Sequence, residues 1–130
     1  MTKPIRQSVT FKATPHEVYE MLMDSRQHAK FTHAAASISR QVGGKISAYD
    51  GYITGTNLEL ELDKKIVQAW HASDWPVEHM SRVVFRLERV KGGTRLVFTH
   101  RNVPEDQYED IKQGWIDNYW KPMKAYLEAK

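Results

Sequence analysis

The chain has 130 residues, of which 41% are hydrophobic and 27% are charged, and its formal net charge is only +3. One domain over residues 1–130 can therefore bury a proper core, and the absence of cysteine excludes disulfides, thiolate metal sites and cysteine nucleophiles. No apolar run approaches the roughly 20 residues that span a bilayer, and the first residues lack an apolar signal-peptide core. We therefore expect a cytoplasmic protein without membrane insertion.

The first quarter of the chain predicts a strand followed by two short helices. Apolar and polar residues alternate over Ile5–Phe11, which is the pattern of a half-buried strand. Residues 14–17 then form a capping box, with a proline at the first helical position. We expect Ser25 to cap the second helix, which carries His28 and Phe31.

The middle of the chain predicts a run of strands joined by short turns. Asp50-Gly51 and Gly92-Gly93 are strong hairpin signals, and short connections of this kind imply antiparallel order. Residues 74–79 form a wider loop. Extended structure is expected to begin at Ile38, and full strands are expected at residues 45–49, 52–62, 66–73, 81–90 and 94–101.

Residues 104–127 are typical of one long amphipathic helix. Acidic residues come first and lysines come late, as the helix dipole favours. Pro122 lacks an N–H group, so we expect the helix to bend or break near residues 120–122. Gly114 costs about 1 kcal/mol inside a helix, so we expect it either to leave space or to allow a close approach. The apolar stripe consists of Tyr108, Ile111, Trp115, Ile116, Tyr119, Trp120, Met123 and Leu127.

The order of these elements predicts an α+β domain: a strand, two short helices, five or six further strands and one long helix. A sheet of this size twists and curls, and the aromatic helix needs a large apolar surface. We therefore expect the terminal helix to lie across the concave face of the sheet. Ile5–Phe11 should pair within that same sheet, because there is no second sheet for it to join.

A series of short motifs appears in a fixed order along almost the whole chain. The motifs are Thr14-Pro15 with Val18-Tyr19, Phe31, Val42-Gly43-Gly44-Lys45, Gly51-Tyr52-Ile53-Thr54-Gly55, Ile66-Val67-Gln68-Ala69-Trp70, Gly92-Gly93-Thr94-Arg95-Leu96, and Gly114-Trp115 with Trp120 and Pro122. This ordered set resembles the activator of Hsp90 ATPase C-terminal-domain-like family, within the START/Bet v 1-like (SRPBCC) superfamily.

The resemblance implies the helix-grip fold. In this fold a curved antiparallel sheet of about six or seven strands surrounds a long C-terminal helix, two short helices follow the first strand, and a cavity lies between sheet and helix. The superfamily includes lipid and hormone binders, polyketide cyclases and a co-chaperone domain, so the fold leaves function open. The eukaryotic co-chaperone also has a separate N-terminal chaperone-binding domain, for which 130 residues leave no room. Asn57 stands where relatives carry apolar residues, which implies a local bulge.

The polar residues show no linear motif for catalysis or metal binding. The six histidines lack the spacing of helical metal ligands, no serine lies in a GxSxG context, and the paired glycines are turn residues rather than phosphate cradles. We therefore predict no catalytic residues, no cofactor and no metal ion. Arginines such as Arg82, Arg86 and Arg95 are scattered singly, which favours a solvated sheet face over a nucleic-acid track.

Aromatic residues on the inward faces of strands and helix mark the candidate ligand site. They either fill the core or line a pocket, in which tryptophan N–H and tyrosine hydroxyl groups would be the polar handles. His100 should point inward, as a hydrogen-bonded core histidine or as a polar anchor. The Asp74-Trp75-Pro76 turn either rims the opening or simply packs its tryptophan. The candidate ligand contacts are Phe31, Trp70, Phe85, Phe98, His100, Trp115 and Tyr119.

Three functions are compatible with this sequence. The first is a ligand-binding domain that holds a hydrophobic or amphipathic small molecule between sheet and helix. The second is a protein-interaction module, related to the Hsp90 ATPase activator, which acts on a chaperone or another protein through its surface. The third and weakest is a cyclase- or hydrolase-like enzyme. We expect a monomer or weak dimer that does not bind nucleic acid.

Overall fold

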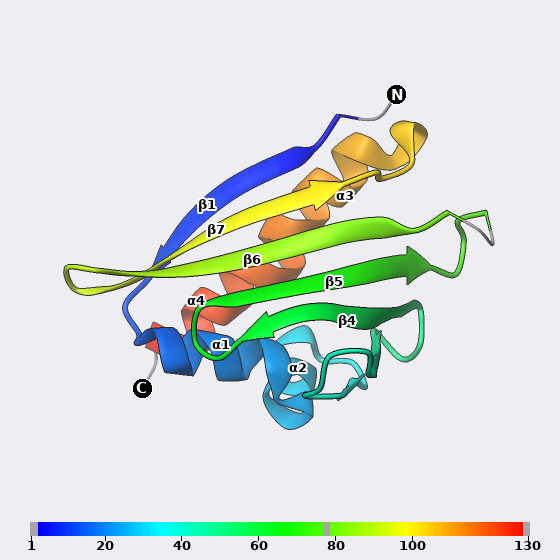
Figure 1. Cartoon of the computed structure of the whole chain (residues 1–130). Coiled ribbons are helices and arrows are strands. Elements are labelled where there is room, and N and C mark those ends of the chain that lie inside the picture. Colours follow the sequence, from blue (N-terminus) through cyan, green and yellow to red (C-terminus); the bar gives the residue numbers. More distant parts are fainter. Residues whose placement is uncertain (1–2, 77–78, 129–130) are drawn as a thin grey trace.

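The computed structural model describes residues 3–76 and 79–128. Within them, one seven-stranded antiparallel sheet curls around the helices, which lie on its concave side (Figure 1). This is the α+β architecture that the order of elements predicts, and it is the helix-grip fold that the family resemblance implies. Residues 77–78 of the expected wide loop, and both ends of the expected domain, lie outside the described residues.

The sheet has the strand order β1-β7-β6-β5-β4-β3-β2, so the first strand lies beside the last. The pairing of β1 with β7 runs from Ile5 opposite His100 to Phe11 opposite Thr94, which confirms that the first strand joins the sheet. The predicted bounds of the later strands agree closely with the observed ones. The strands are β1 (Ile5–Phe11), β2 (Ser37–Ile38), β3 (Lys45–Ala48), β4 (Ile53–Glu61), β5 (Lys65–Ala72), β6 (Ser81–Val90) and β7 (Gly93–Arg101).

A bulge in β4 is built around the side chain of Asn57. The pairing of β4 with β5 shifts register between Asn57 and Glu59. The buried Asn57 amide donates to the carbonyl oxygens of Ser39 and Gln41, at 2.7 and 2.9 Å, and accepts a hydrogen bond from Gln68 at 3.0 Å. The expected bulge is confirmed, and its amide ties the loop before β3 to the inner face of the sheet.

Two short helices, α1 (Pro15–Met23) and α2 (Ser25–Thr32), follow β1. The first begins with the predicted capping box, in which the side chains of Thr14 and Glu17 each accept a hydrogen bond from the other's backbone N–H. The predicted cap of α2 is wrong by one residue, because Asp24 accepts the N-terminal hydrogen bond. Ser25 instead accepts a hydrogen bond from the backbone N–H of Ile38 and so ties α2 to β2.

The C-terminal helical segment is built from four consecutive pieces rather than from one uniform α-helix. It begins just after Pro104 and lies across the concave face, as predicted (Figure 1). The pieces are η1 (Glu105–Gln107), α3 (Tyr108–Trp115), the π-helical turn η2 (Ile116–Trp120) and α4 (Lys121–Glu128).

The π-helical turn stands one turn before the expected break at residues 120–122. In this turn, the backbone N–H of Lys121 donates to the carbonyl of Ile116, five residues back. Pro122 has no N–H to offer the carbonyl of Asn118, and the hydroxyl of Tyr49 donates to that carbonyl at 3.3 Å. The helix is thus interrupted, but by a wide turn and not by a break.

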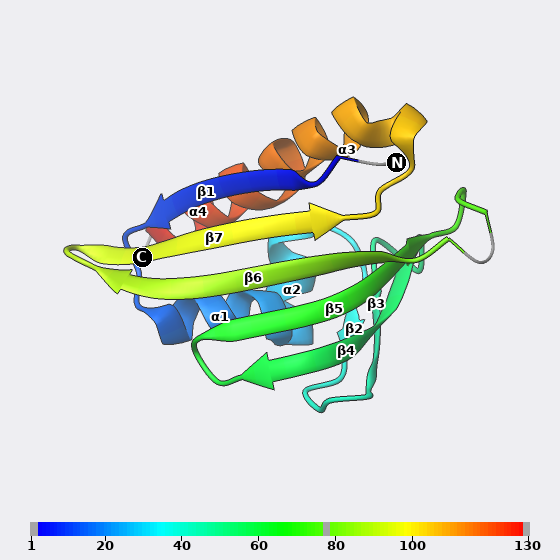
Figure 2. The ribbon, with the colours of Figure 1, turned by 45° about the horizontal axis from the view of Figure 1, so that its top comes forward.

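The core forms where the concave face of the sheet meets the aromatic stripe of the C-terminal segment (Figure 2). Trp115 lies at the centre of this contact. Its ring centroid is 4.3 Å from that of Phe98 and 5.0 Å from that of Trp70. The indole N–H of Trp120 donates to the side-chain oxygen of Gln7 at 2.6 Å, which ties the helix to β1.

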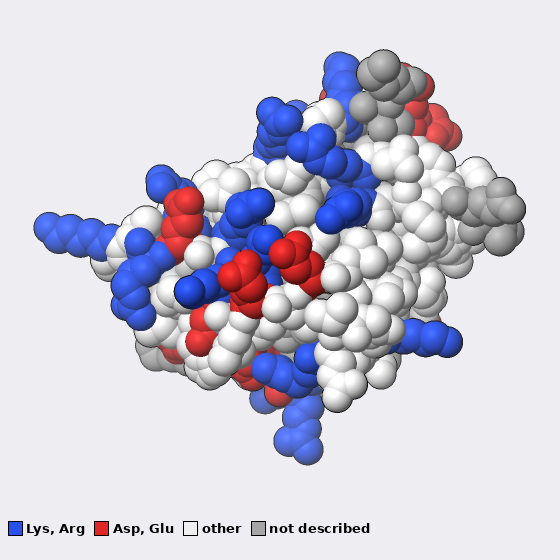
Figure 3. Space-filling model, in the orientation of Figure 1, with Lys and Arg blue, Asp and Glu red and all other residues white. Residues whose placement is uncertain are grey.

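The outer face of the sheet is solvated and basic, as the scattered arginines predict. Arg82 and Arg101 lie directly opposite each other on β6 and β7, and both are exposed. Arg6 is exposed on the neighbouring strand β1. Figure 3 shows Lys and Arg side chains gathered over this face. Like charges directly opposite across strands are unfavourable for the sheet, and the carboxylate of Glu59, which interacts electrostatically with Arg82 and Arg86, offsets part of that repulsion.

Candidate functional site

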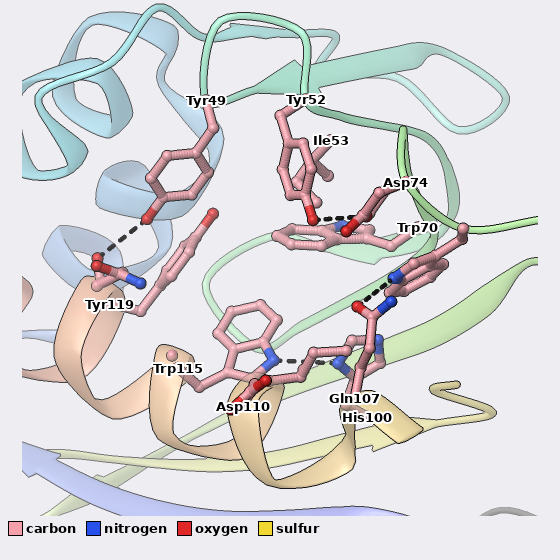
Figure 4. A pocket seen from close by; sticks show the side chains of 15 residues that line it. Tyr49, Tyr52, Ile53, Trp70, Asp74, His100, Gln107, Asp110, Trp115 and Tyr119 are labelled. Carbon is pink, nitrogen blue, oxygen red and sulfur yellow. Dashed lines mark hydrogen bonds between the residues drawn. The ribbon is translucent and has the colours of Figure 1, made fainter. Parts of the chain in front are cut away.

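A pocket of about 490 Å³ opens between the concave face of the sheet and the C-terminal helical segment (Figure 4). Its walls come from the loop between β3 and β4, the end of β5 with the loop that follows, β7, and the helical pieces η1 to η2. The lining residues are Tyr49, Tyr52, Ile53, Trp70, Ala72, Asp74, Trp75, His100, Gln107, Asp110, Ile111, Gly114, Trp115, Asn118 and Tyr119.

The loop between β3 and β4 presents two tyrosines to the pocket. Tyr49, Asp50 and Gly51 have φ angles of 53°, 56° and 90°, so the chain reverses tightly and both Tyr49 and Tyr52 face the pocket (Figure 4). A left-handed backbone is uncommon for a bulky residue. The hydrogen bond of Tyr49 to the C-terminal segment and its ring contact with Tyr119, at 6.1 Å between centroids, hold it there.

The helical wall follows the ordinary spacing of one helix face. Gln107, Ile111, Gly114 and Asn118 recur every three or four residues, beside the stripe that contains Trp115. A β-carbon placed on Gly114 would meet only the side-chain nitrogen of Asn118, at 3.7 Å. Of the two expectations for this glycine, the structure therefore supports open space and not a close approach.

Four of the seven candidate ligand contacts line the pocket, namely Trp70, His100, Trp115 and Tyr119. The other three are buried in the core and contribute no lining. Phe98 and Phe85 lie behind Trp115, with centroids at 4.3 and 5.9 Å from its ring. Phe31 lies behind Tyr119 at 5.4 Å. Four of the predicted residues thus line the pocket, whereas the other three fill the core.

A hydrogen-bond chain with a defined direction runs through His100. Because an indole N–H can only donate, Nε1–H of Trp115 donates to Nδ1 of His100 at 3.0 Å. The remaining ring proton is therefore on Nε2, which donates to Oγ of Ser81 at 2.7 Å. The Ser81 hydroxyl in turn donates to the carbonyl of Trp70 at 3.0 Å. Burial lowers the pKa of His100 to about 3, so this imidazole is neutral.

A second series of hydrogen bonds fixes the indole ring of Trp70, which lines the pocket in contact with Trp115. The indole N–H of Trp70 donates to the side-chain oxygen of Gln68 at 2.8 Å, and the Gln68 amide donates to Asn57 at 3.0 Å. Both Gln68 and Asn57 are buried. Trp70 is therefore anchored, through Gln68, to the same bulge at Asn57 that holds the loop before β3.

Tyr119 is oriented by a histidine that the sequence did not single out. Nδ1–H of His28 donates to the carbonyl of Leu22 at 3.2 Å, so Nε2 accepts the hydroxyl of Tyr119 at 2.8 Å. Burial lowers the pKa of His28 to about 4, despite the opposing hydrogen bond to Leu22. Burial also raises the pKa of Tyr119 well above its usual value, which keeps its hydroxyl proton available for this bond.

The rim of the pocket is polar and joined by hydrogen bonds across elements. The hydroxyl of Tyr52 donates to Asp74 at 2.7 Å, and burial together with this carboxylate raises the pKa of Tyr52 to about 12. The indole N–H of Trp75 donates to the side-chain oxygen of Gln107 at 3.1 Å. The Asp74-Trp75-Pro76 turn therefore both rims the opening and packs its tryptophan.

His100 is not available for proton transfer at this site. Both ring nitrogens of His100 are engaged, so it has no lone pair to offer a substrate as a general base. In the part of the chain that the structure describes, no three His, Asp or Glu side chains gather closely enough to hold a metal ion. None of the described helices is long and apolar enough to cross a membrane.

Sequence reasoning missed much of the lining. Tyr49 and Tyr52 flank a recognised hairpin turn, and two tyrosines around such a turn were a usable signal. Residues 107 to 118 of the helical wall share the spacing of one helix face next to Trp115, which was a second signal. No pattern indicated that His28 and Tyr119, 91 positions apart, form a hydrogen bond.

The model of the family described as activator of Hsp90 ATPase homolog 1-like protein matches residues 12–128. This chain belongs to that family. The match covers both short helices, the later strands and the C-terminal segment, and it confirms the family resemblance of the sequence motifs.

Curated relatives of the family are longer than this chain. The human activator of 90 kDa heat shock protein ATPase homolog 1 is 30% identical over 115 residues, which are 88% of this chain and 34% of the human protein. An uncharacterized protein of Schizosaccharomyces pombe is 32% identical over 125 residues, which are 95% of this chain and 37% of that protein. The chain thus spans about a third of the length of these relatives.

A solved structure of similar length supports the fold. An HSP90 activator from Plasmodium falciparum is 25% identical to this chain and superimposes with a TM-score of 0.91, with 96% of each chain covered. Similar folds at lower identity include a protein from Mesorhizobium loti, with 16% identity and a TM-score of 0.86. This chain therefore shares its fold with both solved structures.

The indole N–H of Trp115 can be tested separately from its bulk. Trp115→Phe keeps a ring but leaves Nδ1 of His100 unpaired in the core, so we expect the free energy of unfolding to fall by about 1–3 kcal/mol. Trp115→Ala should cost about 3–5 kcal/mol, because a large buried ring is lost. Urea unfolding measures both. Trp120→Phe is the matched control, because its partner Gln7 is only part-buried; equal losses in the two Phe variants would contradict a special role for His100.

The two buried histidines predict a pH-dependent stability. Their pKa values in the folded protein, about 4 for His28 and about 3 for His100, lie below the usual 6.5. The unfolded chain therefore binds more protons between these values, and the free energy of unfolding should fall as the pH drops from about 6.5 towards 4. Urea unfolding along a pH series measures this slope.

The conservative variants His28→Gln and His100→Gln should each flatten that slope. His16→Gln is the control, because His16 is exposed and its hydrogen bond with Asp63 raises its pKa, which gives the opposite sign. If neither His28→Gln nor His100→Gln changes the slope of the free energy of unfolding against pH, these histidines are not the source of the pH dependence.

Proposed function

We propose that this chain binds a small hydrophobic or amphipathic molecule in the pocket between the sheet and the C-terminal helical segment. The pocket, at about 490 Å³, has the size of known small-molecule sites, which are mostly apolar and aromatic. Its inner wall is aromatic, with Trp70, Trp115 and Tyr119 all buried. Their polar atoms are already paired with protein groups, so an apolar ligand would leave none of them unsatisfied.

Gly114 is the observation that carries this proposal. A glycine inside a helix costs about 1 kcal/mol relative to alanine, and most such glycines are explained by a close contact. Here a β-carbon would be in ordinary contact with one side chain and nothing else. The missing side chain therefore serves no packing purpose, and its effect is to keep the helical wall of the pocket clear beside Trp115.

Substitutions at Gly114 separate pocket volume from stability. Gly114→Ala should stabilise the fold by up to about 1 kcal/mol and leave room for a ligand. Gly114→Leu should keep the fold but narrow the pocket beside Trp115 and weaken binding. The measurement is tryptophan fluorescence and chemical-shift titration with a panel of amphipathic molecules. No saturable binding by the wild-type chain, or shifts confined to the outer face, would overturn the proposal.

A second candidate function is interaction with a chaperone of the Hsp90 class. The relatives named above are described as activators of the Hsp90 ATPase or are similar to them, and the Plasmodium falciparum protein matches this chain over nearly its whole length. The outer face supports this candidate, because Arg82 and Arg101 are exposed and lie directly opposite each other, where like charges repel. An acidic partner surface would offset that repulsion.

The double variant Arg82→Gln and Arg101→Gln tests this second candidate. If the outer face binds the chaperone, the wild-type chain should accelerate the ATPase of an Hsp90 and the double variant should lose most of that effect. Ligand titration of the pocket should be unchanged, because the sheet lies between the two faces. Lys91→Gln, in the exposed β6–β7 turn, is a control that removes one positive charge away from the Arg82–Arg101 pair. Absence of any ATPase effect or binding by the wild-type chain would rule this candidate out.

A further inference from the structure

The charged residues that line the pocket are all acidic, although the whole chain carries a net charge of +3. Asp74 and Asp110 are among the fifteen lining residues, and none of the fifteen is a lysine or an arginine. Their side chains come from different walls: Asp74 from the loop after β5, and Asp110 from α3 (Figure 4). His100 adds no positive charge, because it is buried and neutral.

Both carboxylates have unused capacity to accept hydrogen bonds. Asp74 accepts one hydrogen bond, from Tyr52 to Oδ1, among the described residues, whereas an ionised carboxylate offers about four acceptor positions. Asp110 has no hydrogen-bond or ion-pair partner within residues 3–76 and 79–128. These groups can therefore receive a positively charged ligand without giving up a protein contact.

The aromatic lining offers π-faces but no free polar hydrogens. The three indole N–H groups donate to side chains of the protein, as described above for Trp70, Trp75 and Trp115. The three tyrosine hydroxyls are also committed: Tyr49 donates to the carbonyl of Asn118, Tyr52 to Asp74, and Tyr119 to His28. An anionic ligand would therefore meet two carboxylates and, as side-chain donors, the amide groups of Gln107 and Asn118, whereas a cation would meet aromatic rings and acceptors.

We infer that the pocket selects organic cations: amines or quaternary ammonium compounds that carry an apolar or aromatic body. The inference rests on the proposed ligand-binding function and names the class of its ligand. Aromatic rings attract a cation electrostatically, and the side chains of Asp74 and Asp110 are exposed, so a ligand that enters from solvent can reach both carboxylates. The apolar body fills the space beside Gly114, and the cationic group lies between the rings and the two carboxylates.

Three probes of one shape test this selectivity. They are benzyldimethyl(hydroxyethyl)ammonium, its neutral isostere dimethylphenylbutanol, in which a quaternary carbon replaces the nitrogen, and the anion dimethylphenylbutanoate. We expect the cation to bind about ten-fold more tightly than the alcohol, and the anion to bind more weakly than both. This preference should decrease as the salt concentration rises, because salt screens the carboxylates.

Isosteric variants assign the preference to the two carboxylates. Asp74→Asn with Asp110→Asn should reduce the preference for the cation over the alcohol to about three-fold or less, which the ring faces alone supply, and should leave binding of the alcohol unchanged. Asp106→Asn removes one negative charge from η1 outside the lining and should preserve the ten-fold ratio.

The outcomes separate the inference from the proposed function. Saturable binding of the alcohol without preference for the cation would overturn the cation inference and leave the proposed ligand-binding function standing. A preference that the double variant keeps, or that Asp106→Asn also removes, would overturn the role of the two carboxylates. No saturable binding of any probe, together with none in the wider panel, would overturn both.

Discussion

The structure depends on one contact: the seating of the aromatic C-terminal segment on the concave sheet through Trp115 and His100. The indole ring contacts the strands, and its N–H donates to Nδ1 of the buried His100, which fixes the tautomer of this histidine. A buried imidazole without this donor would have to find another partner or be protonated at a high cost. The same bond sets the position of Trp115 in the wall, so core packing and pocket shape are determined together.

The pocket and the outer face are separate surfaces of one sheet. Residues that point inward on β5 and β7 belong to the core and the pocket, and their neighbours in the chain point towards the outer face. Because the two surfaces use alternate residues, a ligand site and a protein-interaction site are not in competition for side chains. Family membership is compatible with either use, and so the assignment depends on experiments that address each face alone.

Local patterns were sufficient for most of the fold and for part of the site. Period-two alternation located the strands, the capping box located α1, and strand phase placed His100 inward. The division of the aromatic residues between core and pocket was not predictable, because it depends on depth below the surface. Phe98 and Trp115 are both aromatic residues on a predicted inward face, yet only Trp115 reaches the pocket. Hydrogen bonds between distant residues, such as His28 with Tyr119, have no signature in local sequence.

The π-helical turn accounts for an odd feature of the amino-acid sequence, the recurrence of apolar residues at intervals of four. Ile111, Trp115, Tyr119, Met123 and Leu127 follow that interval, whereas an α-helix has about 3.6 residues in each turn. In an uninterrupted α-helix these side chains would wind progressively around the axis. One added residue at Ile116–Trp120 resets the phase by about 100°, so that Trp115 before the turn and Met123 and Leu127 after it are all buried. The π-helical turn thus realigns the apolar stripe, so that the C-terminal helical segment keeps the same side towards the curved sheet along its length.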